Sequence, residues 1–277
     1  MIKIFVLASG RTGTKYLAEL FENNIKKCVA KHEPKIDMFG KPIYWNFEGD
    51  FKKIRKRFKL KRWIINRYNA DVFIETNHAF LKSFSDIAIE YFPDMKLVHP
   101  IRNVLEVAKS QYNRTKRVWI GEPDKNLKID SYHIYTGGDG KKYCRWTLTG
   151  KEKIFQEINI NLSKYQKFLV QWIEIENRAM NFLKKYNKEK DCFTINMPND
   201  LNNEKKINEM FNFFGLKTKK SNTDFKGNRN PGKKPTVVTP EEIKQLKELI
   251  ENIPEKYITI FNKKPYKQFE WAKMLVK

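Results

Sequence analysis

Polar and charged side chains follow three apolar segments of this 277-residue sequence, at the point where each segment ends. Residues 9–15 (SGRTGTK) come directly after the apolar run at residues 2–7, residues 75–78 (ETNH) follow a second run, and Arg102 follows a third. In an open parallel sheet, ligands bind beyond the carboxyl ends of the strands. We therefore expect these three sets of side chains to form one site, suited to a phosphate-rich ligand.

Residues 9–15 have the composition of an anion-binding turn. They switch abruptly to small, hydroxylated and basic side chains, and after them Tyr16, Leu17 and Leu20 recur as on one face of a helix. A strand, a glycine turn and a helix start direct backbone N–H groups at one spot, which favours an anion and usually a phosphate. The candidate phosphate-binding residues are Ser9, Gly10, Arg11, Thr12, Gly13, Thr14 and Lys15.

This turn does not match the Walker A motif of nucleoside triphosphatases. Lys15 follows Gly10 by five positions, and Gly13 is the only glycine between them. The pattern GxxxxGK[ST] therefore fails, because it needs a glycine immediately before the lysine. In addition, no later strand is expected to end in the aspartate that would hold magnesium. Both observations count against a P-loop kinase.

The elements that position these residues alternate along the chain. This alternation predicts an α/β fold with a central parallel sheet, helices on both faces, and one domain over residues 1–277. Residues 35–46 are expected to be a loop, because Gly40 and Pro42 interrupt regular structure. The expected strands are residues 2–7, 28–31, 71–74, 95–99 and 193–195, and the later helices are residues 51–68, 83–92, 103–112, 162–186, 207–214 and a last one from 239.

Composition narrows the class of protein. The 55 Lys and Arg against 32 Asp and Glu give a net charge of +23, which favours nucleic acid, acidic glycans, membrane surfaces or phosphorylated cofactors as partners. A Lys-rich solvated surface would give the same charge. The basic helix at residues 51–68 is likewise either a nucleic-acid or membrane-surface patch or an ordinary surface helix with its cations in solvent. No apolar run approaches the roughly 20 residues of a membrane span, and no signal peptide is indicated. With three cysteines and no CxxC motif, we expect a cytoplasmic protein.

Two segments depart from the regular alternation. Residues 115–150 combine several glycines with Trp119, Tyr132 and Trp146, which is typical of a β-hairpin excursion or a functional lid. Residues 217–236 form a basic, glycine-containing stretch with few apolar side chains.

The sequence resembles the sulfotransferases that use 3′-phosphoadenosine 5′-phosphosulfate (PAPS). Residues 11–17 (RTGTKYL) follow the order of that family's 5′-phosphosulfate loop: a Lys or Arg, two small residues, a Thr, a variable residue and an aromatic or apolar pair. The family's second element is a strand-end Arg with a Ser eight residues later, and Arg102 and Ser110 have that spacing. The resemblance also includes the region of Trp172 and residues 199–201 and 213–216, so it covers most of the chain.

The resemblance implies a P-loop-like architecture and specific roles. Arg11 would neutralise charge on the bridging oxygen as the sulfuryl group leaves, and the turn at residues 9–15 would hold the 5′-phosphate. Arg102 and Ser110 would hold the 3′-phosphate. PAPS would be the donor and 3′-phosphoadenosine 5′-phosphate (PAP) the product, with no metal. Further contacts expected from the resemblance are Lys226, Gly227 and Arg229 toward the nucleotide, and Trp119, Tyr132 and Trp146 in an acceptor pocket.

The base that takes the acceptor's proton has several candidates. Cytosolic members place a His after Lys-Thr at this strand end, which His78 resembles, whereas glycan-modifying members place a Glu there, which Glu75 resembles. The imidazole of His78 has the better ordinary pKa, and Glu75 would need an apolar pocket to raise its pKa. His32 and Glu33, on the neighbouring strand end, are further candidates for the base or for acceptor contact, and His78 has a purely structural alternative.

These observations together predict an enzyme that transfers a sulfuryl group from PAPS to a hydroxyl or amine of a small molecule or glycan. The first alternative is a P-loop-type nucleotide-dependent kinase, which would bind ATP with magnesium. The second is a basic nucleic-acid-binding protein that uses residues 51–68, although that function leaves Arg102 and Ser110 unexplained. We expect no specific nucleic-acid partner and no membrane span.

Overall fold

The computed structural model describes residues 1–114, 117–123, 130–220 and 237–277. The chain divides into two compact units, and each unit combines segments that are distant in sequence. The first unit contains Met1–Asp37, Phe51–Arg102 and Asn181–Pro231, and the second contains Met38–Asp50, Asn103–Met180 and Gly232–Lys277.

A five-stranded sheet forms the centre of the first unit, in the order β2-β3-β1-β4-β7. Every neighbouring pair runs parallel, so all five carboxyl ends lie along one edge. The predicted parallel sheet is therefore confirmed. Its strands are β1 (Ile2–Val6), β2 (Cys28–Lys31), β3 (Val72–Glu75), β4 (Lys96–Arg102) and β7 (Cys192–Met197).

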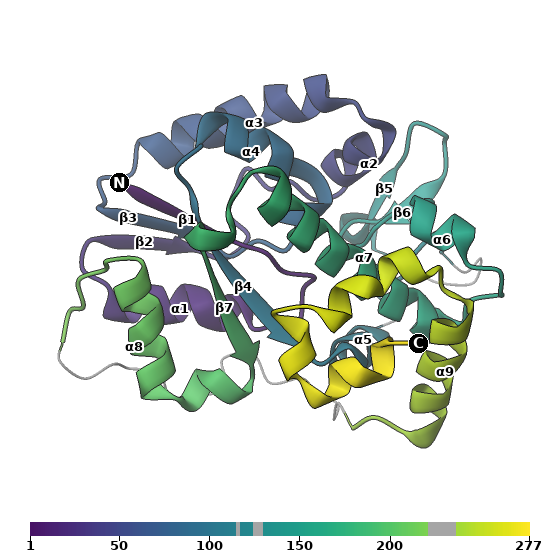
Figure 1. Ribbon diagram of the computed structural model, residues 1–277. Helices are drawn as coiled ribbons and strands as arrows, with labels where there is room; N and C mark the ends of the chain where they lie inside the picture. Colours follow the sequence, from purple (N-terminus) through teal and green to yellow (C-terminus); the bar gives the residue numbers. More distant parts are fainter. Residues whose placement is uncertain (115–116, 124–129, 221–236) are drawn as a thin grey trace. The chain divides into compact units, whose positions relative to one another are not determined.

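Helices cover both faces of this sheet, as the alternation predicts (Figure 1). Side chains of β1 alternate between the faces, so Ile4 and Val6 pack in one apolar cluster with α1 (Thr14–Asn24) and α8 (Glu204–Phe213). Phe5 points to the opposite face, where its ring stacks on those of Phe80 and Phe92 at centroid distances of 5.2 and 6.1 Å. That face is covered by α3 (Phe51–Asn66), the π-helix η1 (Phe80–Phe84) and α4 (Ser85–Tyr91).

Strand β4 runs further than the sequence indicates, and this extension places Arg102. The pairing of β4 with β1 ends at Val98, whereas its pairing with β7 continues to Arg102. Pro100 lacks an N–H donor and suits a strand only where one side needs no ladder hydrogen bond. Beyond Val98, β4 has β7 as its only paired strand among the described residues, so Pro100 is tolerated and Arg102 lies past the end of β1.

The second unit is mainly helical and carries a two-stranded antiparallel hairpin, which agrees with the hairpin interpretation of residues 115–150. Side chains cap the start of two of its helices: Asn103 accepts a hydrogen bond from the N–H of Leu105, and Thr239 forms a capping box with Glu242. The helices and strands of the second unit are α2 (Lys41–Glu48), α5 (Val104–Tyr112), β5 (Ile134–Thr136), β6 (Lys142–Cys144), α6 (Lys153–Glu157) and α9 (Pro240–Asn252). The long helix α7 (Lys164–Lys185) has residues in both units.

The expected loop at residues 35–46 is wrong in its second half, because α2 begins at Lys41. Gly40 immediately precedes the helix with a φ of 68°, and Pro42 lies in its first turn. Proline is favoured in the first turn of a helix, where its missing N–H has no intrahelical partner to lose. Gly40 and Pro42, which are expected from the sequence to interrupt regular structure, therefore mark the start of α2 instead. No helix among the described residues is both long enough and apolar enough to cross a membrane.

Candidate functional site

The turn between β1 and α1 passes through three residues with left-handed backbone conformation. Gly10, Arg11 and Gly13 have φ angles of 95°, 62° and 80°. Glycine adopts such angles without steric cost, whereas a residue with a Cβ atom is strained there by about 1–2 kcal/mol. Strained residues cluster at functional sites, where the surrounding structure holds them. The left-handed Arg11 therefore marks this turn as a candidate site.

Unsatisfied donors gather in this turn. No side chain of the described residues caps the N-terminus of α1, which follows Gly13 directly. The hydroxyl of Thr12 is fully buried and has no hydrogen-bond partner among the described residues. A buried hydroxyl without a partner costs about 1–3 kcal/mol, and the N–H groups and dipole of a helix N-terminus favour an anion. An anion bound in the turn would satisfy both groups, which is the arrangement that a phosphate needs.

Two cations from other elements contact the backbone of this turn. Arg102, at the end of β4, donates from its guanidinium NH1 to the carbonyl oxygen of Arg11 at 3.0 Å. Lys82, in η1, is 1% exposed and its ammonium donates to the carbonyl oxygen of Ser9 at 3.1 Å. Lys15, by contrast, is exposed, and its amine lies 3.8 Å from the carboxylate of Glu19 in the same helix. Arg102 and Lys82 therefore bring positive charge to the turn from other elements, in addition to Arg11 within it.

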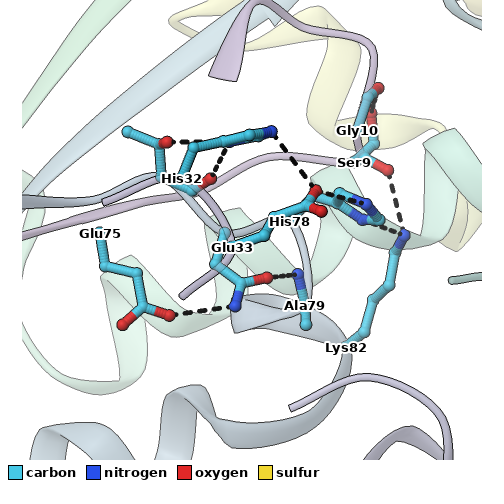
Figure 2. Close-up of polar contacts among 10 residues, drawn as sticks. Ser9, Gly10, His32, Glu33, Glu75, His78, Ala79 and Lys82 are labelled. Atoms are coloured by element: carbon cyan, nitrogen blue, oxygen red, sulfur yellow. Dashed lines mark hydrogen bonds and ion pairs between the residues drawn. The ribbon is translucent and has the colours of Figure 1, made fainter. Parts of the chain in front are cut away.

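Four titratable side chains form a continuous series at the carboxyl ends of β2 and β3 (Figure 2). Nζ of Lys82 lies 3.0 Å from Nδ1 of His78, and Nε2 of His78 lies 3.3 Å from Oε1 of Glu33. The same Oε1 lies 3.7 Å from Nε2 of His32, whose Nδ1 is 3.0 Å from the carbonyl oxygen of Thr76. We call Lys82, His78, Glu33 and His32 the strand-end cluster. It adjoins the turn, because Lys82 contacts Ser9.

The charges in the strand-end cluster follow from burial and from its contacts. Burial, and then the charge of Lys82, lower the pKa of His78 to about 4, so its ring is neutral at neutral pH. Burial alone would raise the pKa of Glu33, but the hydrogen bond from His78 and the positive charges around it lower that pKa to about 2. Glu33 is therefore ionised at neutral pH, and the cluster presents one carboxylate between two imidazole rings.

Glu75 lies near this cluster in sequence but has a different environment. Its carboxylate is 2.8 Å from Nζ of Lys61, and the two side chains are 0% and 2% exposed. Nδ2 of Asn77 donates to the same oxygen at 3.0 Å. Glu75 is thus part of a buried ion pair that holds the end of β3, rather than a group that opens toward the turn.

Sequence reasoning missed two residues that the structure brings to this region, Lys82 and Lys61. Lys82 lies four residues after His78, the spacing that brings side chains together on a helix, and this signal could have been used. Lys61 occupies the apolar stripe of α3, three residues after Phe58 and four before Ile65, and all three side chains are buried. A charged residue at a buried position of a stripe predicts a buried partner.

Other predicted residues lie in the second unit or outside the described residues. Trp119 is 8% exposed, whereas Tyr132 is 59% exposed and its ring packs against that of Trp146 at a centroid distance of 5.8 Å. Ser110 is buried in α5. Because Ser110 belongs to the second unit and Arg102 to the first, their joint role in binding a phosphate remains a prediction. Lys226, Gly227 and Arg229 lie outside the described residues.

Comparisons with known proteins find similarity among solved structures. No protein-family model and no curated protein matches the sequence. Among solved structures, the chain is similar to a sulfotransferase from Alicyclobacillus acidocaldarius, with 14% sequence identity, 90% of each chain covered and a TM-score of 0.48. It is also similar to mouse sulfotransferase SULT7A1 complexed with PAP, with 13% identity, 92% of this chain and 86% of that chain covered, and a TM-score of 0.44.

Proposed function

We propose that this protein is a sulfotransferase that moves a sulfuryl group from PAPS to a hydroxyl or amine of an acceptor. The observation that carries this proposal is the turn after β1, where the buried Thr12 hydroxyl has no hydrogen-bond partner, and the N-terminus of α1 no side-chain cap, among the described residues. The order of residues 11–17 and the position of Arg102 against the same turn then favour a phosphosulfate donor over other anions.

The residues of the turn fit the donor's charged groups. When bound, PAPS supplies a sulfuryl group that is activated by its bond to the 5′-phosphate. The N–H groups of residues 10–15 and the Thr12 hydroxyl would hold the 5′-phosphate, and Arg102 with Ser110 would hold the 3′-phosphate. Arg11 would stabilise the negative charge that develops on the bridging oxygen, because cationic stabilisation does most of the work in a loose transition state.

The kinase alternative is less well supported by the turn. In a Walker A loop the Lys reaches the β- and γ-phosphates, whereas Lys15 here is exposed and lies beside Glu19. The buried cation at the turn is Lys82, which comes from the segment after β3. A nucleic-acid function would depend on α3 and would leave the Thr12 hydroxyl without a role.

Binding of PAP tests this proposal directly. We expect wild-type protein to bind PAP in isothermal titration calorimetry, and Arg102→Ala to weaken that binding about 10- to 100-fold, since a charge-assisted hydrogen bond is worth about 1.5–3 kcal/mol. Arg55→Ala is the matched control. It removes one positive charge from the surface of α3, where Arg55 pairs with Glu90 at 2.8 Å, and should leave PAP affinity unchanged.

Two results of this titration would contradict the proposal. Wild-type protein that fails to bind PAP but binds ATP in the presence of magnesium would favour the kinase. Binding of DNA or RNA that falls steeply with salt and survives Arg102→Ala, with no PAP binding, would favour the nucleic-acid function.

Gly13 provides a test of the turn's geometry. A Cβ atom at Gly13 would lie 1.9 Å from Cε of Met197, and the φ of 80° is unfavourable for any residue with a side chain. We expect Gly13→Ala to lower the free energy of unfolding by about 1–2 kcal/mol and to weaken PAP binding at least about tenfold. Urea denaturation and calorimetry measure the two effects.

Gly215→Ala is the matched control for Gly13→Ala. Gly215 has a similar φ of 65°, but a Cβ atom there meets nothing within 4 Å, and the residue follows α8. It should lose similar stability and keep the PAP affinity of the wild type. Equal PAP affinities in the two variants would show that the turn at Gly13 does not shape the donor site.

The charge and the aromatic content of the chain bear on the class of acceptor. A small molecule or a glycan would suit a chain with a net charge of +23 and an aromatic segment that includes Tyr132 and Trp146. A screen of phenols, alcohols, amines and acidic glycans with PAPS as donor would identify the class. We further propose a cytoplasmic location, with which the absence of a disulfide bond among the three cysteines, all of them in the described part of the chain, is compatible.

A further inference from the structure

We propose that His32, rather than His78 or Glu75, is the base that takes the proton from the acceptor. Lys82, His78 and Glu33 hold its surroundings in place and stabilise the protonated ring. This inference rests on the proposed function and adds the residue that completes its chemistry. It depends on the contacts of four side chains that all belong to the first unit, of which Lys82 also contacts the turn after β1 (Figure 2).

Both ring nitrogens of His78 have partners that oppose a role as base. An ammonium has only N–H donors, so Nδ1 of His78, at 3.0 Å from Nζ of Lys82, must be the unprotonated acceptor. In the neutral ring the proton then lies on Nε2, which donates to the Glu33 carboxylate at 3.3 Å. The only lone pair of the His78 ring is thus directed at a buried cation, where accepting a proton would be unfavourable.

His32 has the opposite arrangement. Its Nδ1 lies 3.0 Å from the carbonyl oxygen and 3.2 Å from the hydroxyl oxygen of Thr76. The hydroxyl can donate or accept, but the nearer carbonyl can only accept, so Nδ1 carries the proton. In the neutral ring Nε2 therefore holds the lone pair. A backbone carbonyl that fixes the tautomer through Nδ1–H is a common way to orient an imidazole for proton transfer. The side chain of His32 is 31% exposed, compared with 14% for His78, so an acceptor can reach it.

Glu33 is placed to stabilise the imidazolium that His32 would become. Its Oε1 lies 3.7 Å from Nε2 of His32, close enough for a charge interaction once that nitrogen is protonated. The hydrogen bond from His78 holds the carboxylate, and Glu33 itself has a left-handed φ of 50°. Lys82 fixes the tautomer of His78, so these three residues act through each other on the position and charge of His32.

The proposed sulfuryl transfer forms one bond to sulfur, breaks another and moves one proton. The acceptor oxygen or nitrogen forms a bond to sulfur with its own electron pair, and its proton moves to Nε2 of His32. The bond between sulfur and the bridging oxygen breaks, and its electron pair leaves with the 5′-phosphate. The proton on His32 then passes to solvent, which the exposed edge of the ring allows.

The tautomers provide a test that needs neither donor nor acceptor. The chain has only four histidines, so long-range ¹H–¹⁵N spectra of histidine-labelled protein at neutral pH can be assigned with His32→Gln and His78→Gln. We expect His32 to carry its proton on Nδ1 and His78 on Nε2. In Lys82→Met, the pKa of His78 should rise, because the cation opposite Nδ1 is gone. Protonation of His32 on Nε2, or a His78 that titrates as in a free peptide, would overturn the inference.

Turnover of the same variants provides the second test. With PAPS and water as acceptor, the release of sulfate should fall about 100-fold or more in His32→Gln, as for loss of a general base, and much less in His78→Gln, whose amide can still donate to Glu33. Lys31→Gln, at the exposed residue before His32 in the chain, is the control and should match the wild type. Full activity of His32→Gln with loss in His78→Gln would identify His78 as the base.

Failure of this inference is distinguishable from failure of the proposed function. PAP affinity should be the same in wild type, His32→Gln and His78→Gln, because neither side chain is placed on the nucleotide. If PAP binds but the tautomers are reversed, the donor site stands and the base is wrong. If PAP does not bind, the sulfotransferase proposal fails, whatever the tautomers are.

Discussion

Replacing Arg11 by alanine is expected to lower the rate of sulfuryl transfer by about 10³-fold, because loss of one preorganised group that stabilises developing charge typically costs this much. The effect should appear mainly in kcat, with a smaller loss of PAP affinity, since the charge on the bridging oxygen develops only in the transition state. Steady-state kinetics with the acceptor identified by the screen, and calorimetry with PAP, measure the two quantities separately.

Two further substitutions at Arg11 distinguish a chemical role from a structural one. Arg11 has a φ of 62°, so alanine keeps the backbone strain of the wild type, whereas Arg11→Gly relieves it. We expect Arg11→Gly to be about 1 kcal/mol more stable than Arg11→Ala and equally inactive. Arg11→Lys should recover part of the rate of sulfuryl transfer. A rate for Arg11→Ala close to that of the wild type would remove Arg11 from the proposed chemistry.

Lys61→Met should lower the free energy of unfolding more than the substitutions at Gly13, Gly215 and Arg11. Loss of the Lys61 ammonium leaves the carboxylate of Glu75 buried without its ion-pair partner, and a buried pair broken in this way typically costs about 3–5 kcal/mol. The carbonyl oxygen of Ile36 also loses the hydrogen bond that Lys61 donates at 3.2 Å. The free energy of unfolding, measured by urea denaturation, should fall by this amount.

The double variant Lys61→Met/Glu75→Gln separates the ion pair from packing. It removes both charges, so most of the lost stability should return. Lys59→Met, an exposed position on the same helix, should change stability little. A loss below about 1 kcal/mol in Lys61→Met would mean that the carboxylate is satisfied in another way, for example by taking up a proton.

The stability of this pair also bears on the site. Glu75 is the last residue of β3 and pairs in register with Phe5 of β1 and Lys31 of β2. The next three residues carry the carbonyl of Thr76, which holds His32, and the ring of His78. We therefore interpret Lys61 and Glu75 as the support of the strand-end cluster, which explains why a conspicuous strand-end carboxylate is buried.

Local sequence is enough to predict the parts of this protein that depend on neighbouring residues in the chain. Alternating apolar runs and helical stripes predicted the parallel sheet and most of its helices, since periodicity is a local property. The turn at residues 9–15 was recognisable because glycines, hydroxyls and a following helix are needed together within a few residues. Arg102 was recognisable as a charge at a strand end.

Which of these residues act together, and in which protonation state, depends on contacts that form only in the folded protein. Lys82, His78, Glu33 and His32 come from segments up to 50 residues apart in the sequence, and no local pattern states which imidazole nitrogen faces a cation and which a carbonyl. The burial of Glu75 likewise depends on Lys61, which the sequence presents as one more cation in a basic helix. Protonation and hydrogen bonding are set by neighbours in space, and those neighbours exist only once the sheet has brought its strand ends to one edge.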